Sequence, residues 1–472
     1  MSHATRTPQP GALNHYTGCR YPRCMIKWSP AICRSVCGRL LWFVAIGWVA
    51  AAMGCVGDAV TVTRSLLQMP DSWDKTVGYL DWASSDVPEA EIQANASNYS
   101  FVWSGGQPSV FRTANASINL GSYMPGFYDD HNGRPEAFPE GPSQDTPERR
   151  ERTLRWWNTE VDGVGHPDWV LYQCDGTTPA YYVEDGRTLP NMPLDITNPS
   201  VIDWQFRSAG AIRDGDLGFN VVSADVVFLM NIQHACGIHR DGQWVQLFDG
   251  RESDPAYKSA VVGWAQRFRA SLHGLPVPRA LVANSSLDVS NSDEEIARLS
   301  AQLDGVLDEQ GFTGFGGGRI FASGESWFHK VRSMIAIQNQ GVSLFSANYV
   351  STLPPPPEDV EWILGSFLMA RGHAAYILIN RSYPGNALWP HLPQYDEDVG
   401  HPCAPMRLYQ NVYVRDYSKG MSVVNPSSRD TFTVTLPPEI LRDVYGRPIE
   451  GNELTLPPAT GKVLLSQSSR CP

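Results

Sequence analysis

The alternation of two periodicities between residues 98 and 380 restricts the fold of this chain more than any other feature. Short apolar runs rich in β-branched and aromatic residues alternate there with segments of helical spacing. Pro255 starts one helical pattern that stops at Gly274, and Ser292 and Glu295 form a capping box ahead of the next. Repeats of strand, helix and strand make successive strands parallel, so the expected fold class is α/β, with a (β/α)8 TIM barrel. The eight expected strands are residues 99–103, 118–124, 169–174, 221–229, 280–283, 306–309, 342–349 and 374–379.

A different pattern follows the Pro-rich stretch 389–405. Residues 412–426 alternate in hydrophobicity around a turn at Ser418-Lys419-Gly420, which predicts a β-hairpin, and no helical spacing returns after it. We therefore expect a barrel over residues 98–400 and a small C-terminal antiparallel β-sandwich domain over 404–468. Residues 58–97 are expected to be a linker and barrel lead-in.

The N-terminal part predicts targeting rather than folded structure. Residues 40–57 form an uncharged apolar run preceded by Lys27, Arg34 and Arg39, which is typical of a signal peptide or membrane anchor over 39–57. Residues 1–38 lack a periodic apolar pattern and are expected to be a disordered leader or an over-extended gene start. The protein is expected to be exported, and so periplasmic, extracellular or anchored to the membrane. A cleaved signal, a lipid anchor and an uncleaved anchor all fit.

Export changes the expectation for the four cysteines that follow the apolar run, because thiols tend to pair in oxidising compartments. Two disulfides are expected among Cys174, Cys236, Cys403 and Cys471. Sequence alone leaves the pairing open, and the prediction for Cys403 and Cys471 is that they join, since each lies at an edge of the C-terminal domain. No acid completes a metal-ligand spacing around residues 234–239, so neither a metal nor another cofactor is expected.

Polar residues end several of the expected strands, where barrel enzymes carry their chemistry. The strongest signal is Asp308-Glu309, which ends an apolar strand and is followed by a glycine-rich stretch. Side chains alternate along a strand, so Gly305, Leu307 and Glu309 share one face and Asp308 lies on the other. A rim of carboxyl and amide groups suits sugar hydroxyls and proton transfer. The other strand-end residues are Asp175, Asn231, Asn284, Asn348 and Tyr349.

Two of these strands carry recognisable motifs. The Leu-Asp-Gly-Val-Leu-Asp-Glu run that ends at Glu309 resembles the second acid motif of glycoside hydrolases built on a (β/α)8 barrel, in which a strand beginning Asp-Gly ends on a Glu. Asp225-Val-Val-Phe-Leu-Met-Asn231 resembles the partner motif of these families, and Met230 stands where its acid belongs. Residues 413–417 and 443–446 look like the β-domain that follows the barrel in the same families. The resemblance covers about residues 98–468, and it implies a glycoside hydrolase with Glu309 as general acid.

The expected function is therefore hydrolysis of a polysaccharide or oligosaccharide outside the cytoplasm. Glycoside hydrolysis usually needs two carboxyl groups, and Asp175 or Asp308 is expected to be the second. Asp225 is disfavoured because it lies well before the expected end of its strand, deep in the strand or at its bottom. The substrate-binding residues are expected to be Asn231, Asn284, Asn348 and Tyr349.

An alternative follows from Met230, because Met can act neither as a base nor as a nucleophile. The chain could then be a catalytically degenerate protein that binds glycans or belongs to the cell envelope. In either case the expected partner is a carbohydrate. A net charge of -12 argues against nucleic acid, attachment to a membrane would use the N-terminal segment, and the oligomeric state is open.

Overall fold

The computed structural model describes residues 66–67, 78, 80–83, 86–128, 146–184, 187–208, 218–226, 234–251, 253–285, 287, 291–381, 391–468 and 471. The chain divides into two compact units, Met1–Val62 and Thr63–Pro472, and all of these residues belong to the second. The expected leader and targeting segment, residues 1–57, lie outside the described residues. Within the described ranges, no helix has both the length and the apolar character needed to cross a membrane.

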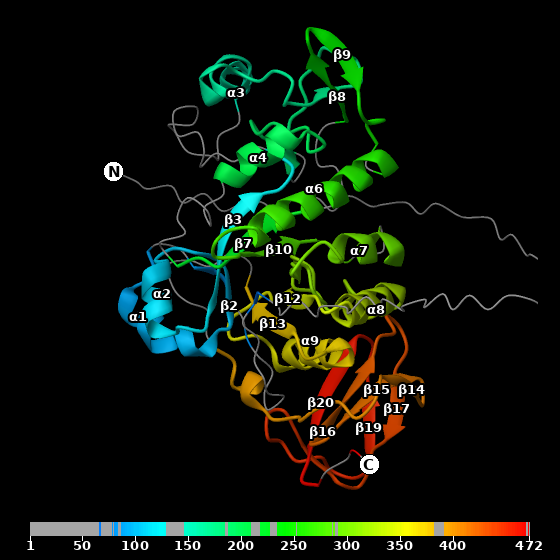
Figure 1. Ribbon diagram of the computed structural model, residues 1–472. Helices are drawn as coiled ribbons and strands as arrows, with labels where there is room; N and C mark the ends of the chain where they lie inside the picture. Colours follow the sequence, from blue (N-terminus) through cyan, green and yellow to red (C-terminus); the bar gives the residue numbers. More distant parts are fainter. Residues whose placement is uncertain are drawn as a thin grey trace, which may run out of the picture. The chain divides into compact units, whose positions relative to one another are not determined.

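An eight-stranded parallel sheet forms the centre of the described unit (Figure 1). Every neighbouring pair runs parallel, and a parallel bridge from Gly78, just before the first strand, to Ile377 in the last joins the two ends of the sheet. The sheet is therefore curled into a barrel-like arrangement. In sheet order the strands are β1 (Leu80–Ala83), β2 (Phe101–Gly105), β3 (Asn119–Pro125), β7 (Val221–Asp225), β10 (Ala280–Asn284), β11 (Gly305–Asp308), β12 (Ser343–Tyr349) and β13 (Ala375–Asn380).

Helices lie between successive strands, and their ends carry the signals seen in the sequence. The Asp254 side chain accepts a hydrogen bond from the Ala256 backbone N–H at the start of α6, and Ser292 and Glu295 make the expected capping box of α7. The α-helices are α1 (Glu89–Asn95), α2 (Pro108–Ala114), α3 (Pro147–Thr159), α4 (Pro199–Ser208), α6 (Pro255–His273), α7 (Asp293–Ser300), α8 (Glu325–Asn339) and α9 (Pro357–Ala370). Short 3-10 helices are η1 (Ala96–Asn98), η3 (Val161–Gly163) and η5 (Pro393–Asp396).

One of the eight expected strands is wrong. The run 169–174 contributes only β4 (Tyr172–Gln173), which pairs antiparallel with β8 (Ala235–Arg240), and β8 pairs antiparallel with β9 (Gln243–Gln246). Its place in the parallel sheet is taken by β1, which lies in the range expected as linker and lead-in. An apolar run indicates that a strand is buried but not which strand it pairs with. The sequence pattern therefore could not show whether 169–174 or β1 belongs to the parallel sheet. A further antiparallel pair joins β5 (Val183–Glu184) and β6 (Arg187–Thr188).

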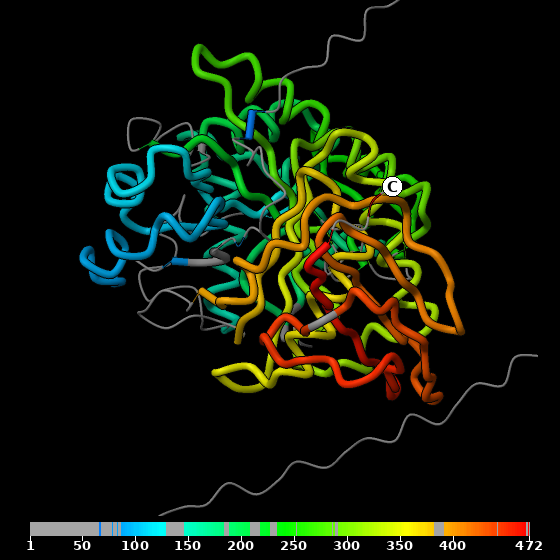
Figure 2. The backbone as a smooth tube through the Cα atoms, turned by 90° about the horizontal axis from the view of Figure 1, so that it is seen from below, coloured from blue at the N-terminus to red at the C-terminus, as the bar shows by residue number. Residues whose placement is uncertain are grey.

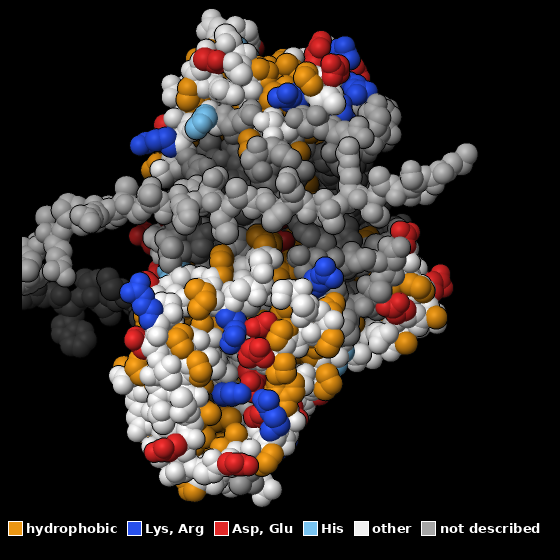
Figure 3. Space-filling view, turned by 180° about the vertical axis from the view of Figure 1, so that it is seen from behind, with side chains coloured by type: hydrophobic (Ala, Val, Ile, Leu, Met, Phe, Trp, Pro, Cys, Tyr) orange, Lys and Arg blue, Asp and Glu red, His pale blue; other side chains and the backbone are white. Residues whose placement is uncertain are grey.

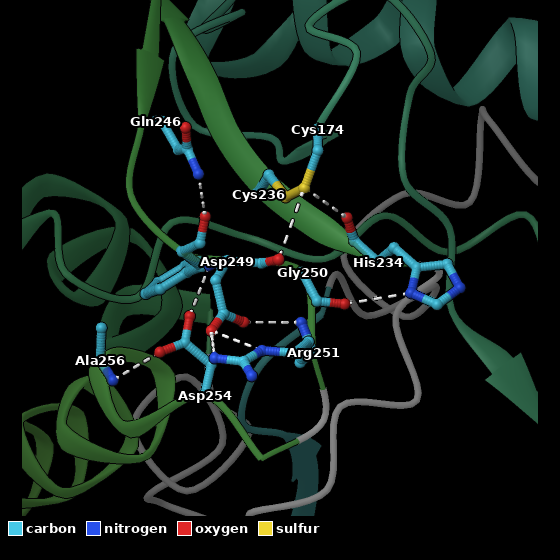
Figure 4. Close-up of polar contacts among 10 residues, drawn as sticks. Cys174, His234, Cys236, Gln246, Asp249, Gly250, Arg251, Asp254 and Ala256 are labelled. Atoms are coloured by element: carbon cyan, nitrogen blue, oxygen red, sulfur yellow. Dashed lines mark hydrogen bonds and ion pairs between the residues drawn. A yellow bond between two sulfur atoms is a disulfide. The ribbon is translucent and has the colours of Figure 1, made fainter.

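A disulfide and a glycine secure this three-stranded sheet near the start of α6 (Figure 4). Cys174 and Cys236 are joined, with 4.9 Å between their Cα atoms. Gly250 has a φ of +77°, and a Cβ atom at this position would lie 2.8 Å from each sulfur. His234 Nδ1 lies 3.0 Å from the Gly250 carbonyl oxygen. Cys236 and His234 therefore hold this corner together through the disulfide and the contact with Gly250.

The C-terminal residues form two antiparallel sheets that share one hydrophobic cluster. The predicted disulfide between Cys403 and Cys471 is confirmed, with 5.0 Å between the Cα atoms. Helix α9 packs against β16 and β20, and Figure 2 shows its yellow segment beside the orange-to-red C-terminal strands. The strands are β14 (Arg407–Tyr409), β15 (Val412–Tyr417), β16 (Gly420–Asn425), β20 (Thr460–Ser466) and β18 (Ile440–Asp443) in one sheet, and β17 (Phe432–Thr435) and β19 (Glu453–Leu456) in the other.

Ion pairs reinforce the contact between α9 and this domain. Glu361 of α9 is buried and accepts hydrogen bonds from Arg447, at 2.9 Å, and from Lys462, at 2.5 Å. Two cations satisfy the two oxygens of one buried carboxylate, so burial of this charge is compensated. Acidic and basic side chains also lie next to one another on the face of the molecule seen in Figure 3.

Side chains alternate between the two faces of each strand, and this alternation decides which residues reach the mouth of the parallel sheet. Alternate strand residues, joined by Leu67, form an inner hydrophobic cluster, and the intervening residues pack in a second cluster with the helices. In β7, β10, β12 and β13 the inner series ends at Asp225, Asn284, Tyr349 and Asn380. The inner cluster contains Leu67, Phe101, Trp103, Val221, Ala280, Val282, Leu307, Phe345, Ala347, Tyr376 and Leu378.

Candidate active site

Two carboxylates meet through one amide at the carboxyl ends of the strands. The Asn284 Nδ2 group donates to Glu309 Oε2 at 2.6 Å and to Asp225 Oδ1 at 3.2 Å. Because both bonds start on the same nitrogen, the two oxygens are at most about 5.8 Å apart. Carboxyl groups lie about 5 Å apart in retaining glycosidases and about 6.5 to 9.5 Å apart in inverting ones. This upper limit lies below the inverting range and is compatible with the retaining one.

Strand register explains why these three residues converge. Asn284 of β10 lies opposite Asp225 of β7 on one side and opposite Leu307 of β11 on the other. Glu309 comes two residues after Leu307, so it shares the inner face and stands one layer higher. Since residues of like parity in neighbouring parallel strands point the same way, the amide is held between the two acids.

Asp225 lies in the site although it was not expected there. The residue was expected deep in a strand running from 221 to 229, but β7 ends at Asp225 itself. Asp225 therefore lies at the carboxyl end and faces the mouth. Its motif was visible in the sequence, and only the extent assigned to the strand excluded it. Met230 and Asn231 lie outside the described residues.

Two tyrosines flank the acids. The Tyr123 hydroxyl of β3 donates to Asp225 Oδ2 at 2.5 Å, and burial together with the charge of Asp225 raises the pKa of Tyr123 well above its ordinary value of about 10. Tyr123 therefore stays protonated and remains a donor at neutral pH. On the other side, the Tyr349 hydroxyl of β12 lies 3.5 Å from Glu309 Oε1, and its ring stacks on Phe315.

Asn380 extends the same layer on β13, where it pairs in register with Tyr349. It shares the parity of the inner residues Tyr376 and Leu378 and is 1% exposed. Its Oδ1 accepts a hydrogen bond from the Arg381 backbone, while its Nδ2 has no hydrogen-bond partner among the described residues. A buried amide donor without a partner is costly, by about 1–3 kcal/mol, which favours an acceptor bound at this position. Its signal in the sequence was the same strand-end polarity that marked Asn284.

Asp308 faces away from the mouth. Both of its oxygens accept from Lys330 Nζ of α8, at 2.8 and 2.7 Å, and both side chains are almost completely buried. Burial raises the pKa of the Asp308 carboxyl, and the Lys330 charge opposes that effect. The residue thus joins β11 to α8, and it does not meet the Asn284 cluster.

Asn348 is also on the outer face and is fully buried. Its Oδ1 accepts from the Phe312 backbone N–H at 2.7 Å, and its Nδ2 donates to the carbonyls of Ser346 and Leu378. Gly311 has a φ of +45°, and a Cβ there would lie 2.2 Å from Asn348 Oδ1. Asn348 therefore shapes the loop after Glu309 through bonds within the protein, while its neighbour Tyr349 lies in the candidate site.

Asp175 lies in a different sheet from the acid pair. It follows β4 in an exposed turn, where its oxygens accept from Thr177 and Thr178. Hydrogen bonds from Thr178 and then Thr177 lower the pKa of Asp175 to about 2. The expectation that it ends a barrel strand fails with the expected strand 169–174. In the described parts of the chain, no group of three or more His, Cys, Asp or Glu side chains could hold a metal ion.

No protein-family model matches the chain, and no curated protein matches it. Among solved structures, it is similar to a Paenibacillus sp. cycloisomaltooligosaccharide glucanotransferase, with 10% identity, a TM-score of 0.38 and coverage of 83% of this chain and 55% of that one. A Flavobacterium johnsoniae GH31 dextranase matches with 10% identity and a TM-score of 0.41, over 84% of this chain and 52% of that one. The chain thus spans about half the length of these two proteins.

A third similar structure is the cyclic α-maltosyl-(1→6)-maltose hydrolase of Arthrobacter globiformis. It matches with 12% identity and a TM-score of 0.39, over 84% of this chain and 96% of that one. Similarity at these TM-scores carries no argument about this chain.

Proposed function

We propose that the protein is an exported glycoside hydrolase that cleaves a polysaccharide or oligosaccharide with retention of configuration. The proposal includes closure of the parallel sheet as a (β/α)8 barrel, followed by a C-terminal β-sandwich domain. One observation carries it: two carboxylates at the strand ends, Asp225 and Glu309, share a single amide donor on Asn284.

In this mechanism Asp225 is the nucleophile and Glu309 the acid. Asp225 attacks the anomeric carbon, the bond to the glycosidic oxygen breaks, and the Glu309 proton moves to that oxygen. Water then attacks the covalent intermediate and gives its proton to Glu309, which releases the sugar and frees Asp225. Tyr123 and Asn284 support the role of Asp225 as nucleophile, because donors to its carboxylate favour the ionised form.

Two variants test the roles of the acids. Glu309→Gln and Asp225→Asn keep the shapes of the side chains and remove the transferable proton and the nucleophile. Each is expected to lower kcat at least 100-fold, since general acid help alone contributes about 100- to 10,000-fold. Asp175→Asn in the exposed turn is the control and should keep parental activity. Equal rates for the parent and Glu309→Gln on a cleaved glycan would refute the site.

The stereochemistry provides a second measurement. The anomer released first by the parent, followed by NMR within minutes of mixing, should match the anomer of the substrate. Release of the opposite anomer would contradict the assignment of Asp225 as nucleophile, because it would require water to attack directly.

Export rests on the apolar run 40–57 and on two disulfides, which persist in oxidising compartments. A fusion of residues 1–97 to a reporter that is active only outside the cytoplasm should be active. The same fusion lacking residues 40–57 should not, and activity of both would contradict export by this segment.

The second candidate is a protein that binds glycans without cutting them, favoured by Met230 in the position of the family's acid. Reducing-end release from a polysaccharide panel separates the candidates. If the parent binds a glycan but releases no product, while Met230→Asp releases product, the degenerate reading is correct.

A further inference from the structure

The loop that follows Glu309 exposes an unusual amount of apolar surface. Phe315, Ile320 and Phe321 are 48%, 58% and 48% exposed, and they are three of the eight large apolar side chains exposed in the described part of the chain. Exposed apolar side chains that gather beside a polar site commonly mark a binding surface. We call these three residues the apolar rim.

The loop's backbone holds the rim in place. Gly314 has a φ of +62°, and a Cβ there would lie 2.8 Å from the Phe321 ring, so Phe321 packs directly on the chain next to Phe315. The Phe321 N–H donates to the Gly318 carbonyl at 3.1 Å, which closes the turn beneath Ile320. Rim side chains are therefore displayed by a compact turn.

The rim is also continuous with the acid. The Phe315 and Tyr349 rings stack with 5.5 Å between their centroids and 24° between their planes. The Tyr349 hydroxyl lies 3.5 Å from Glu309 Oε1. The exposed Phe315 ring is thus separated from Glu309 only by Tyr349, on the side of β12.

Strand order indicates which part of a substrate reaches this surface. The sheet runs from β7 through β10 and β11 to β12, so Asp225 and the rim lie on opposite sides of Glu309. The sugar that is attacked must lie over Asp225, and the group whose oxygen is protonated must lie beyond Glu309. The rim therefore borders the leaving group.

We infer that the apolar rim binds the leaving group and that this group carries an alkyl or aryl surface. The inference rests on the proposed function and specifies its substrate: an oligosaccharide joined to an apolar aglycone and cleaved at the bond to that aglycone. Contact between an apolar aglycone and Phe315, Ile320 and Phe321 removes both surfaces from water. A sugar can stack its C–H face on a Phe ring, but its hydroxyl edge needs hydrogen-bond partners, and these three side chains offer none.

Matched substrates test the inference. A panel of 4-nitrophenyl glycosides of common hexoses and pentoses, in both anomers, identifies a cleaved sugar, and the glycosyl fluoride of that sugar and anomer is the comparison. Fluoride is too small to reach the rim. Phe315→Ala and Phe321→Ala should each lower kcat/KM for the 4-nitrophenyl glycoside by about tenfold and leave the fluoride within about twofold. Leu408→Ala, 64% exposed in the C-terminal domain, is the control.

Three outcomes would overturn the inference. Equal losses of kcat/KM on the fluoride and on the 4-nitrophenyl glycoside would show that the rim contacts the attacked sugar and not the leaving group. Unchanged kcat/KM on both substrates would show that the rim does not contact the substrate. If the matching disaccharide is cleaved better than the aryl glycoside and both rim variants lose that preference, the leaving group is a sugar.

A binding measurement separates failure of this inference from failure of the proposed function. Saturation transfer from the parent to n-octyl β-D-glucopyranoside, below its micellar concentration, should appear on the octyl protons and disappear in the Phe315→Ala and Phe321→Ala variants. If no glycoside is hydrolysed but this pattern holds, the rim binds apolar groups and the hydrolase proposal fails. Absence of transfer to the parent would refute the rim itself.

Discussion

Removing Lys330 should destabilise the protein strongly, because its ammonium is the partner of both oxygens of Asp308. The two side chains are 1% and 0% exposed, and the two N–O distances are 2.8 and 2.7 Å. Lys330→Met leaves a carboxylate buried between β11 and α8 without its cation. Loss of one member of a buried pair typically costs about 3–5 kcal/mol. The free energy of unfolding at pH 7, measured by urea denaturation with tryptophan fluorescence, should fall by that amount.

The loss should also depend on pH. Burial raises the pKa of Asp308, and in the parent the charge of Lys330 opposes this effect. Lys330→Met removes that opposition, so the pKa of Asp308 rises further. The folded variant then keeps a proton that the unfolded chain releases above about pH 4, so its stability falls as pH rises, by up to about 1.4 kcal/mol per unit. The difference between parent and variant should therefore be larger at pH 8 than at pH 5.5.

Two controls make this test specific. Arg207→Met breaks the exposed pair with Asp162, whose side chains are 64% and 41% exposed, and should cost less than about 1 kcal/mol. The double variant Asp308→Leu/Lys330→Met should be more stable than Lys330→Met alone, because no buried charge remains. A Lys330→Met variant within about 1 kcal/mol of the parent would refute the reasoning.

Other predictions follow from the same structure. Asn284→Ala removes the donor shared by Asp225 and Glu309 and should lower kcat about 10- to 100-fold with little change in stability; unchanged kcat would show that the amide does not position the acids. Cys403→Ser opens a disulfide that spans 68 residues and should lower the free energy of unfolding by about 4 kcal/mol, and an equal loss on reduction of a Cys174→Ser/Cys236→Ser variant, which keeps only this disulfide, checks it. Gly250→Ala places a Cβ at 2.8 Å from the sulfurs of the other disulfide at a positive φ, so thermal unfolding should begin at least several degrees lower; Gly242→Ala, at a positive φ with open space, is its control.

Much of the fold follows from local patterns. The capping residues of α6 and α7 could be predicted from the sequence. The free backbone groups at a helix end are satisfied by residues close by in the chain, so their pattern is local. Seven of the expected strands correspond to strands of the parallel sheet for a similar reason: a strand buried on both faces is a short apolar run. The exception, residues 169–174, is also a short apolar run, but it pairs antiparallel outside that sheet.

The candidate site depended on the extents of the strands. Sequence reasoning found Glu309, Asn284 and Tyr349, since each ends a clear apolar strand on its inner face. It placed Asp225 too deep because residues after 225 are as apolar as those before it, and apolarity alone does not mark where a strand ends. It also included Asp308, although alternation along β11 had already put that residue on the face opposite Glu309.

The sequence by itself determined the α/β class, the helix ends, the C-terminal β-strands and the inner face of Glu309, because each depends on residues close together in the chain. Tertiary structure alone decided that β1 completes the sheet, that Lys330 reaches Asp308, and that Asn284 joins Asp225 to Glu309. These side-chain contacts join residues 22 to 59 positions apart in the chain, which no local pattern encodes.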